Sequence, residues 1–166
     1  MRHLSPKLRT ALTVVILLII CLIFYFAGKN MGRGTKTSDD PLSIGIGERW
    51  GGALPSGFTK TEISFLQDGK GWVFASLLYE QDVSGLLTEW EKPAQGMQAG
   101  LDAVLDELMS QEGLTAQQRV QLAENRPVLD DSWIAYSVSG ADDPGDVIYL
   151  AYHAAEKRMV VAERQQ

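Results

Sequence analysis

The first pattern along the chain is an unbroken apolar run at residues 11–28, ALTVVILLIICLIFYFAG, which contains no charged side chain. An α-helix of this length spans about 27 Å, close to the thickness of the hydrocarbon core of a bilayer. The run therefore predicts a transmembrane helix. Residues 1–10 form a short basic tail before it, which we expect in the cytoplasm.

We expect this helix to be an uncleaved signal anchor. Cleavage by a signal peptidase requires small residues one and three positions before the cut. Ala27 meets the first requirement, but Tyr25 occupies the other position. Cys21 follows Ile20 and precedes the run LIFYF, so it is better explained as one more apolar residue than as a site of lipid attachment.

The orientation of the anchor follows from the residues around it. Three basic residues precede it and three follow it: Arg2, Lys7 and Arg9, then Lys29, Arg33 and Lys36. This equal distribution leaves the positive-inside rule undecided. A short basic tail directly before an apolar run resembles a secretion signal, so we expect the domain that follows to lie outside the cytoplasm.

The pattern after the anchor is that of a polar linker at residues 29–42 and a domain at residues 43–166. In residues 57–65, GFTKTEISF, the side chains of Thr61, Ile63 and Phe65 alternate with polar ones, which predicts a strand. Residues 72–80, WVFASLLYE, are apolar on both faces, as in a covered strand.

A hairpin joins these two predicted strands. Asp68 and Gly69 are a strong signal for a two-residue turn. With that turn, Phe65 faces Trp72 and Ile63 faces Phe74, so large apolar side chains meet across the hairpin.

Apolar residues at helical spacing follow the hairpin. Ser84 can cap a short helix that ends at Pro93, a longer one begins at Met97 and stops at Gly113, and Thr115 with Gln118 makes a capping box for a third. Three further strands are predicted at residues 132–138, 147–153 and 158–163. The order β-β-α-α-α-β-β-β predicts an α+β fold, with an antiparallel sheet and the helices packed on one face.

Two short motifs suggest functions that their surroundings do not support. SIGIGERWGG, at residues 43–52, resembles a nucleotide-binding loop, but Trp50 stands where the third glycine belongs, and we interpret the segment as irregular. GFTKTEISF resembles the cleavage junction of type IV prepilins. A prepilin needs about 20 apolar residues after that junction, and only residues 63–66 follow before a polar turn.

The distribution of charged residues excludes one class of partner for the domain. All 21 acidic residues lie beyond residue 38, together with nine of the 15 basic ones, which gives this part of the chain a formal charge of −12. Phosphate binding needs clustered basic residues, so nucleic acid is excluded as a partner. Cys21 is the only cysteine, so the domain has no disulfide.

The candidates for chemistry are few. His153 is the only histidine of the domain and shares a strand face with Tyr149 and Ala151, which is typical of a hydrogen-bonded histidine in a sheet. A nucleophilic triad would have to use it, and a zinc site needs more ligands of its kind. We therefore predict no metal site and no cofactor.

The acidic residues form no catalytic pattern. Asp142, Asp143 and Asp146 lie in GADDPGD, which lacks the spacing of a calcium loop and favours a solvated turn. A second turn is predicted at residues 130–131. Glu89 and Glu91 flank Trp90 and would point to different sides of a helix, which makes them poor partners for acid–base catalysis.

The tryptophans are the remaining candidates, because an exposed aromatic platform can stack on the sugars of a cell envelope. Trp72 and Trp133 have apolar neighbours in predicted strands, which indicates core packing. Trp90 lies on the predicted helix that follows Ser84. Trp50 lies among glycines, and we expect it to be exposed.

These patterns predict a single-pass membrane protein that presents an acidic α+β domain at the outer face of a bacterial cytoplasmic membrane. We expect a binding or interaction module that is not an enzyme, with the bilayer and a protein of the envelope as its partners. The alternative is an envelope hydrolase that uses carboxylates and His153.

Overall fold

A computed structural model describes residues 38–68, 70–141 and 143–166, and these residues form one compact unit. The predicted tail at residues 1–10, the anchor at residues 11–28 with Cys21, and the first part of the predicted linker lie outside the described residues. The α+β fold that the sequence predicts is confirmed for the described domain.

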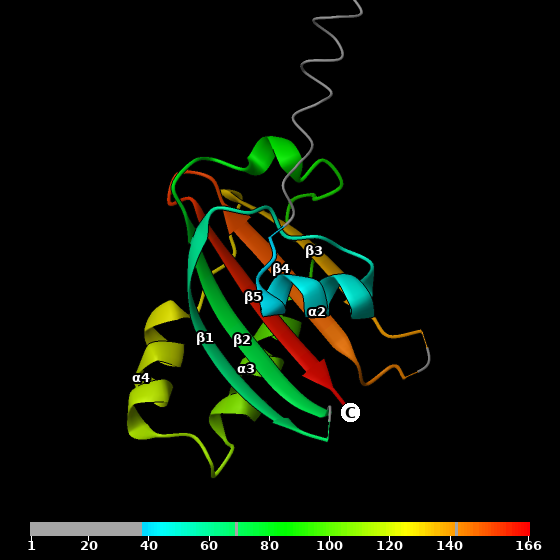
Figure 1. Ribbon diagram of the computed structural model, residues 1–166, viewed down its shortest axis with the longest axis vertical. Coiled ribbons are helices and arrows are strands. Elements are labelled where there is room, and N and C mark those ends of the chain that lie inside the picture. The colour runs from blue at the N-terminus through cyan, green and yellow to red at the C-terminus, as the bar shows by residue number, and fades with distance from the viewer. Residues whose placement is uncertain (1–37, 69, 142) are drawn as a thin grey trace, which may run out of the picture. The chain divides into compact units, whose positions relative to one another are not determined.

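A five-stranded antiparallel sheet forms the centre of the domain (Figure 1). In spatial order its strands are β1 (Phe58–Gln67), β2 (Lys70–Tyr79), β5 (Arg158–Gln165), β4 (Val147–His153) and β3 (Trp133–Ser139). The last strand in sequence, β5, therefore lies at the middle of the sheet, between the two hairpins that precede it. All five strands were predicted from their apolar patterns, with small differences at their ends.

The register of the first hairpin is the predicted one. Phe65 pairs with Trp72, and Ile63 pairs with Phe74. Asp68 has a φ of 53°, the left-handed conformation that a tight two-residue hairpin turn requires. The alternation of β1 therefore places Ile63 and Phe65 on the same face as Phe74.

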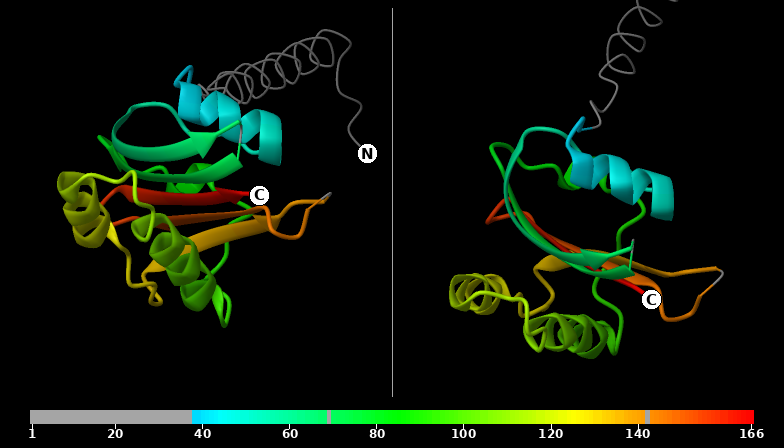
Figure 2. Two further views of the ribbon diagram at one scale, coloured as in Figure 1. Left: turned by 90° about the horizontal axis from the view of Figure 1, so that it is seen from below. Right: turned by 60° about the horizontal axis from the view of Figure 1, so that its bottom comes forward.

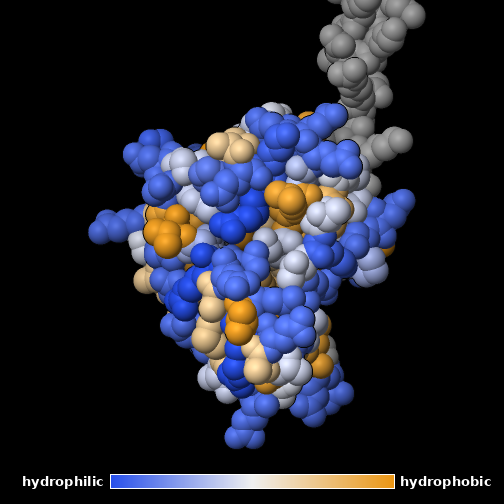
Figure 3. Space-filling view, turned by 90° about the vertical axis from the view of Figure 1, so that its left-hand side faces the viewer, coloured by the Kyte–Doolittle hydropathy of each residue, from blue (hydrophilic) through white to orange (hydrophobic). Residues whose placement is uncertain are grey.

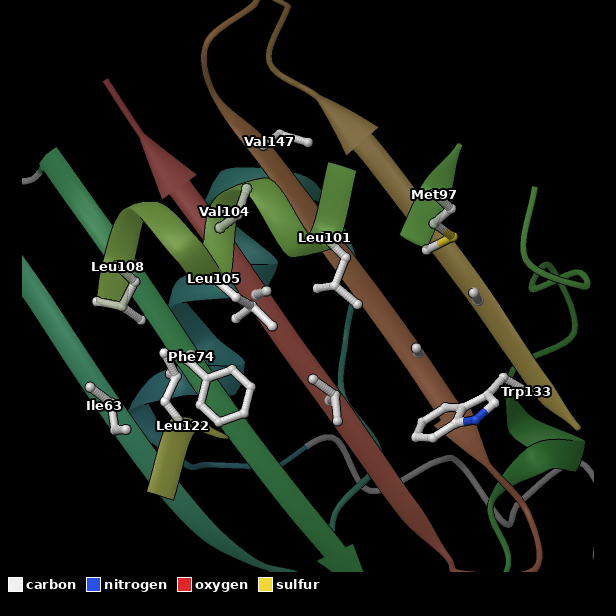
Figure 4. Packing of buried hydrophobic residues seen from close by; sticks show 14 of the residues in the cluster. Ile63, Phe74, Met97, Leu101, Val104, Leu105, Leu108, Leu122, Trp133 and Val147 are labelled. Atoms are coloured by element: carbon white, nitrogen blue, oxygen red, sulfur yellow. The ribbon is translucent and has the colours of Figure 1, made fainter. Parts of the chain in front are cut away.

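Two helices pack on one face of the sheet. These are α3 (Met97–Met109) and α4 (Ala116–Asn125), which lie together below the sheet in Figure 2. The apolar stripe of α3, with Leu101, Leu105 and Leu108, packs against Phe74 and its neighbours (Figure 4). Both halves of the predicted capping box of α4 are present, between Thr115 and Gln118.

The other face of the sheet carries a helix that the sequence analysis missed. Residues Pro41–Trp50 form α2, which lies above the sheet in Figure 2. Asp40 caps it by accepting a hydrogen bond of 2.9 Å from the backbone N–H of Leu42, and Gly51 ends it with a φ of 70°. The predictions that residues 43–52 are irregular, that the linker extends to residue 42 and that the helices share one face are therefore wrong.

Tertiary packing explains the presence of this helix. Its two internal glycines, Gly45 and Gly47, disfavour helix formation. However, Leu42 and Ile46 are buried with side chains from β2, β4 and β5 in a second apolar cluster. The burial of these two side chains favours the helix by more than the glycines disfavour it.

A loop covers the remainder of this face. The helix predicted from Ser84 to Pro93 is only a single 3₁₀ turn, η1 (Ser84–Leu86). Val83 and Leu87, on either side of it, are buried in the same cluster as Ile46. Further along the loop, Glu91 forms an isolated antiparallel bridge with Ala135 of β3.

Candidate functional site

A pocket of about 270 Å³ lies on the α2 face of the sheet. On one side it is lined by the end of α2 and the turn at residues 51–54, and on the other by residues 86–90 of the loop after β2. Tyr136 of β3 and Leu150 of β4 line it from the sheet. Three aromatic side chains from three separate elements, Trp50, Trp90 and Tyr136, thus meet at one pocket.

A buried carboxylate fixes the position of Trp50. The indole N–H of Trp50 donates to Oε1 of Glu163 over 2.6 Å. Glu163 lies on β5 and is fully buried, and its two oxygens also accept hydrogen bonds from the guanidinium of Arg49, of 2.7 and 2.8 Å. Trp50 is therefore half-buried and anchored to the sheet, so the prediction that it is exposed is wrong.

Tyr152 fixes the start of the opposite loop. Its hydroxyl accepts a hydrogen bond of 3.0 Å from the backbone N–H of Val83 and donates one of 3.0 Å to Asp82. The backbone and hydroxyl of Ser84, and then Tyr152, donate hydrogen bonds that lower the pKa of Asp82. Burial raises the pKa of Tyr152, so both groups keep the protonation states that this network needs near neutral pH.

Contacts with the edge strand fix the end of this loop. The rings of Trp90 and Tyr136 are stacked, with centroids 6.3 Å apart and planes 17° apart. Next to Trp90, the backbone N–H of Glu91 donates to Ala135 over 3.2 Å, and Ala135 donates back to Glu91 over 2.7 Å. Both walls of the pocket are thus held in place by side-chain or backbone contacts to the sheet.

Glu89 and Glu91 do not lie on a helix, in contrast to the prediction. Both side chains are exposed, and only Glu89 lines the pocket. The sequence argument that a helix turns these two side chains to different sides therefore does not apply.

His153 occupies a structural position in the sheet. Its ring centroid lies 5.1 Å from that of Trp133, and its Nδ1 accepts a hydrogen bond of 3.2 Å from the backbone N–H of Glu156. Its side chain is 16% exposed. This environment agrees with the interpretation of His153 as a hydrogen-bonded histidine of the sheet.

The acidic loop lies at the opposite end of β4 from His153. Asp143 accepts a hydrogen bond of 2.7 Å from the backbone N–H of Gly145, as in an Asx turn, and Asp146 accepts one of 2.6 Å from the backbone of Gln166. Asp142 lies outside the described residues. His153 is seven positions beyond Asp146 along β4, a distance of about 23 Å, so the structure does not bring these two groups together.

The other predicted turn is confirmed. Asp130 accepts a hydrogen bond of 2.9 Å from the backbone N–H of Ser132, and its own carbonyl accepts one of 3.1 Å from the N–H of Trp133. Asp131 lies 3.4 Å from the ammonium group of Lys92.

Among the residues that the structure describes, no group of three or more His, Cys, Asp or Glu side chains is placed to hold a metal ion.

Trp72 and Trp133 pack against the core on the other face, as predicted. Trp133 is 4% exposed, and the guanidinium of Arg158 lies 5.4 Å from the centroid of its ring. The indole N–H of Trp72 donates to Glu107 over 3.1 Å. The sequence analysis therefore assigned these two tryptophans to the core correctly.

The sequence analysis missed Glu163 and the pocket. A single carboxylate within the apolar run of β5, MVVAER, was a local signal of a buried ion pair. Its partner, however, lies 114 residues away in a segment taken to be irregular. The pocket itself had no signal in the sequence, because its walls come from the end of α2 with the turn after it and from the loop after β2, which only the sheet brings together.

In the part of the chain from residue 38 on, the structure contains no helix with the length and apolarity to cross a membrane. In comparisons with known proteins, the chain matches no protein-family model, no curated protein and no solved structure.

Proposed function

We propose that the domain is a binding module without a catalytic role, held at a membrane by residues 11–28 and displayed on its outer side. The observation that carries the binding role is the pocket between Trp50 and Trp90. Pockets lined by aromatic side chains with a few polar groups are the usual form of a small-ligand site. The distance between His153 and the acidic loop favours a binding role over hydrolysis.

The face of the molecule that carries β1 and α4 shows no broad docking surface. On the side where β1 and α4 lie, hydrophobic side chains form small separate patches among hydrophilic ones (Figure 3). This distribution is typical of solvated protein surface, whereas broad docking faces present a continuous apolar area. The membrane attachment rests on the apolar run of the sequence alone.

Site-specific crosslinking in native membranes tests the binding role. A photoreactive residue in place of Thr88, which lines the pocket, should give a discrete adduct that mass spectrometry can identify. The matched control is the same residue in place of Glu124, an exposed position on α4. Adducts of equal yield at both positions, or at neither, would contradict a binding role for the pocket.

Protease accessibility tests the attachment separately. Protease added to intact spheroplasts should digest the domain, and the N-terminal tail should survive. Protection of the domain until lysis would reverse the proposed orientation, and release of the intact chain by alkaline carbonate would contradict the anchor.

A further inference from the structure

We propose that the pocket binds a compact organic cation, an ammonium or guanidinium group, which deepens the proposed function and rests on it. Among the described residues that line the pocket, the only ionisable acid or base side chain besides the phenol of Tyr136 is the carboxylate of Glu89. The same pocket is lined by the rings of Trp50, Trp90 and Tyr136. A carboxylate next to several aromatic rings is the combination that attracts a cation and gives an anion no partner.

The neighbouring basic residue does not cancel this charge. Arg49 precedes Trp50, but both of its hydrogen bonds go to the two oxygens of Glu163, which lies beneath α2. The pair Arg49–Glu163 has no net charge, so Glu89 sets the sign of the potential at the pocket. The formal charge of −12 beyond residue 38 acts in the same direction, since it raises the local concentration of cations.

The rings supply the second attraction. Tryptophan is the best partner for a cation among the aromatic side chains, and two tryptophans line this pocket, one from the end of α2 and one from the loop after β2. Trp90 is stacked on Tyr136, which holds its indole in place before a ligand arrives. A ligand therefore does not have to order this ring on binding, which lowers the entropic cost of association.

The size of the pocket limits the ligand to one compact group. Its volume of about 270 Å³ lies just below the range for pockets that hold drug-sized molecules, roughly 300–1,000 Å³. An extended sugar chain would exceed that volume. Besides Glu89, the lining side chains carry two hydroxyls, those of Thr88 and Tyr136, and two indole N–H groups, of which that of Trp50 is already bonded to Glu163. These are few groups for a ligand that depends on hydrogen bonds.

A pair of isosteric probes tests the role of charge. Choline and 3,3-dimethylbutan-1-ol have the same shape, but only choline carries a charge. In the full ¹⁵N-labelled chain in nonionic detergent, choline should shift the indole resonances of Trp50 and Trp90. The indole resonances of Trp72 and Trp133, which pack on the opposite face, should not move and serve as an internal control.

Two further probes define the chemical class. Argininamide presents a guanidinium group, as a protein side chain would, whereas choline presents the headgroup of a lipid. Methyl glucoside is the neutral sugar control. Binding of either cation at least fivefold tighter than both neutral probes supports the proposal, and the tighter of the two cations identifies the source.

Variants of the pocket complete the test. Glu89→Gln should weaken binding of the preferred cation about two- to fivefold at low salt, and Trp90→Leu should weaken it about 2- to 30-fold. The matched control Glu91→Gln removes an equal charge from a residue that does not line the pocket, and it should change the affinity less than Glu89→Gln. Unchanged indole resonances of Trp72 and Trp133 in the free Trp90→Leu chain show that the fold is retained.

Two results would overturn the proposal. One is equal affinity for choline and its uncharged isostere, since the pocket would then recognise shape alone. The other is a response of Trp50 and Trp90 to methyl glucoside but to neither cation. If Thr88 still captures a partner in membranes in these cases, the binding module stands and only its ligand class is wrong. If Thr88 captures nothing, the proposed function fails as well.

Discussion

Arg49 of α2 and Glu163 of β5 form a bidentate ion pair across 114 positions of sequence, with N–O distances of 2.7 and 2.8 Å. Glu163 is fully buried, whereas the side chain of Arg49 is 35% exposed. The pair ties the first helix of the domain to the central strand of the sheet. Since Trp50 shares the same carboxylate, the pair also positions one wall of the pocket.

Loss of Arg49 should destabilise the domain. Arg49→Ala leaves the carboxylate of Glu163 buried without its cation, a change that costs 3–5 kcal/mol at fully buried pairs. Because Arg49 is partly exposed and Trp50 still donates to Glu163, we expect a loss of about 2–3 kcal/mol. Urea unfolding of the full chain in detergent, followed by tryptophan fluorescence, measures it.

The neighbouring residue supplies the control for this experiment. Glu48 is exposed on the same helix, and Glu48→Ala should change the free energy of unfolding by less than about 0.5 kcal/mol. In the double variant Arg49→Ala, Glu163→Leu, the loss should be smaller than the sum of the two single losses. Equal stability of the Arg49 and Glu48 variants would show that the pair does not hold α2.

The structure moves the start of an independently folding fragment from Ser43 to Ser38. A fragment of residues 38–166 keeps the Asp40 cap and buried Leu42, whereas one of residues 43–166 loses both. The cap contributes about 1 kcal/mol and burial of Leu42 about 1.5–3 kcal/mol. We therefore expect the shorter fragment to be less stable by about 2–4 kcal/mol.

Thermal and urea unfolding of both fragments test this expectation. The longer fragment should unfold cooperatively and equally well in EDTA, and added NaCl should stabilise it modestly by screening its negative charge. Equal stability of the two fragments would mean that the first turn of α2 contributes nothing. Folding that depends on Ca²⁺ would contradict the prediction that the domain has no metal site.

Two glycines near the first hairpin should respond very differently to alanine. Gly57 has a φ of +89°, and a Cβ there would meet no atom within 4 Å. Gly71 has a φ of +133°, and a Cβ there would collide with the carbonyl oxygen of Phe65. We expect Gly57→Ala to cost about 1–2 kcal/mol and Gly71→Ala about 3–5 kcal/mol.

The same substitution settles the prepilin resemblance. Gly57 immediately precedes β1, so Gly57→Ala should change the mass of the chain only by the one added CH₂ group and should leave its membrane attachment unchanged. Mass spectrometry and membrane fractionation of the two proteins check this. A larger product from the variant would show that a peptidase cleaves at this position.

Tyr79 should make the domain sensitive to alkaline pH. Burial, and then the neighbouring Tyr152, raise the pKa of Tyr79 well above its ordinary value of 10. A group with a raised folded-state pKa contributes stability that is complete below pH 10 and is lost as pH rises above it. Tyr79→Phe should therefore flatten the loss of stability above pH 10.

Phenolate absorbance and urea unfolding at several pH values measure this effect. Tyr79 should ionise only under conditions where the domain unfolds. The number of ionised tyrosines should therefore be one lower in the variant than in the native chain after unfolding, and equal before it. The variant also loses the contact between the Tyr79 hydroxyl and the sulfur of Met159, which are 3.8 Å apart, so it should be slightly less stable at neutral pH. An unchanged pH profile would contradict the role of Tyr79.

Local patterns in the sequence determined most of the secondary structure. Alternation in β1 and the turn at Asp68 predicted the register in which Phe65 meets Trp72, because side-chain period and turn length together fix the pairing of a hairpin. The capping box at Thr115 predicted α4, since both of its hydrogen bonds form within one helical turn. Apolar neighbours also identified Trp133 as a core residue.

The tertiary structure alone decided the arrangement of the second face. With two internal glycines, α2 has little helical propensity of its own, and it forms because the sheet buries Leu42 and Ile46. The segment after Ser84 has a helical pattern in the sequence, but it forms a loop whose end pairs with β3 through the bridge between Glu91 and Ala135. The pocket depends on both of these outcomes. Trp50 and Trp90 line it because the sheet holds their segments on either side of it. Burial against a distant strand depends on long-range contacts, which the local sequence does not encode.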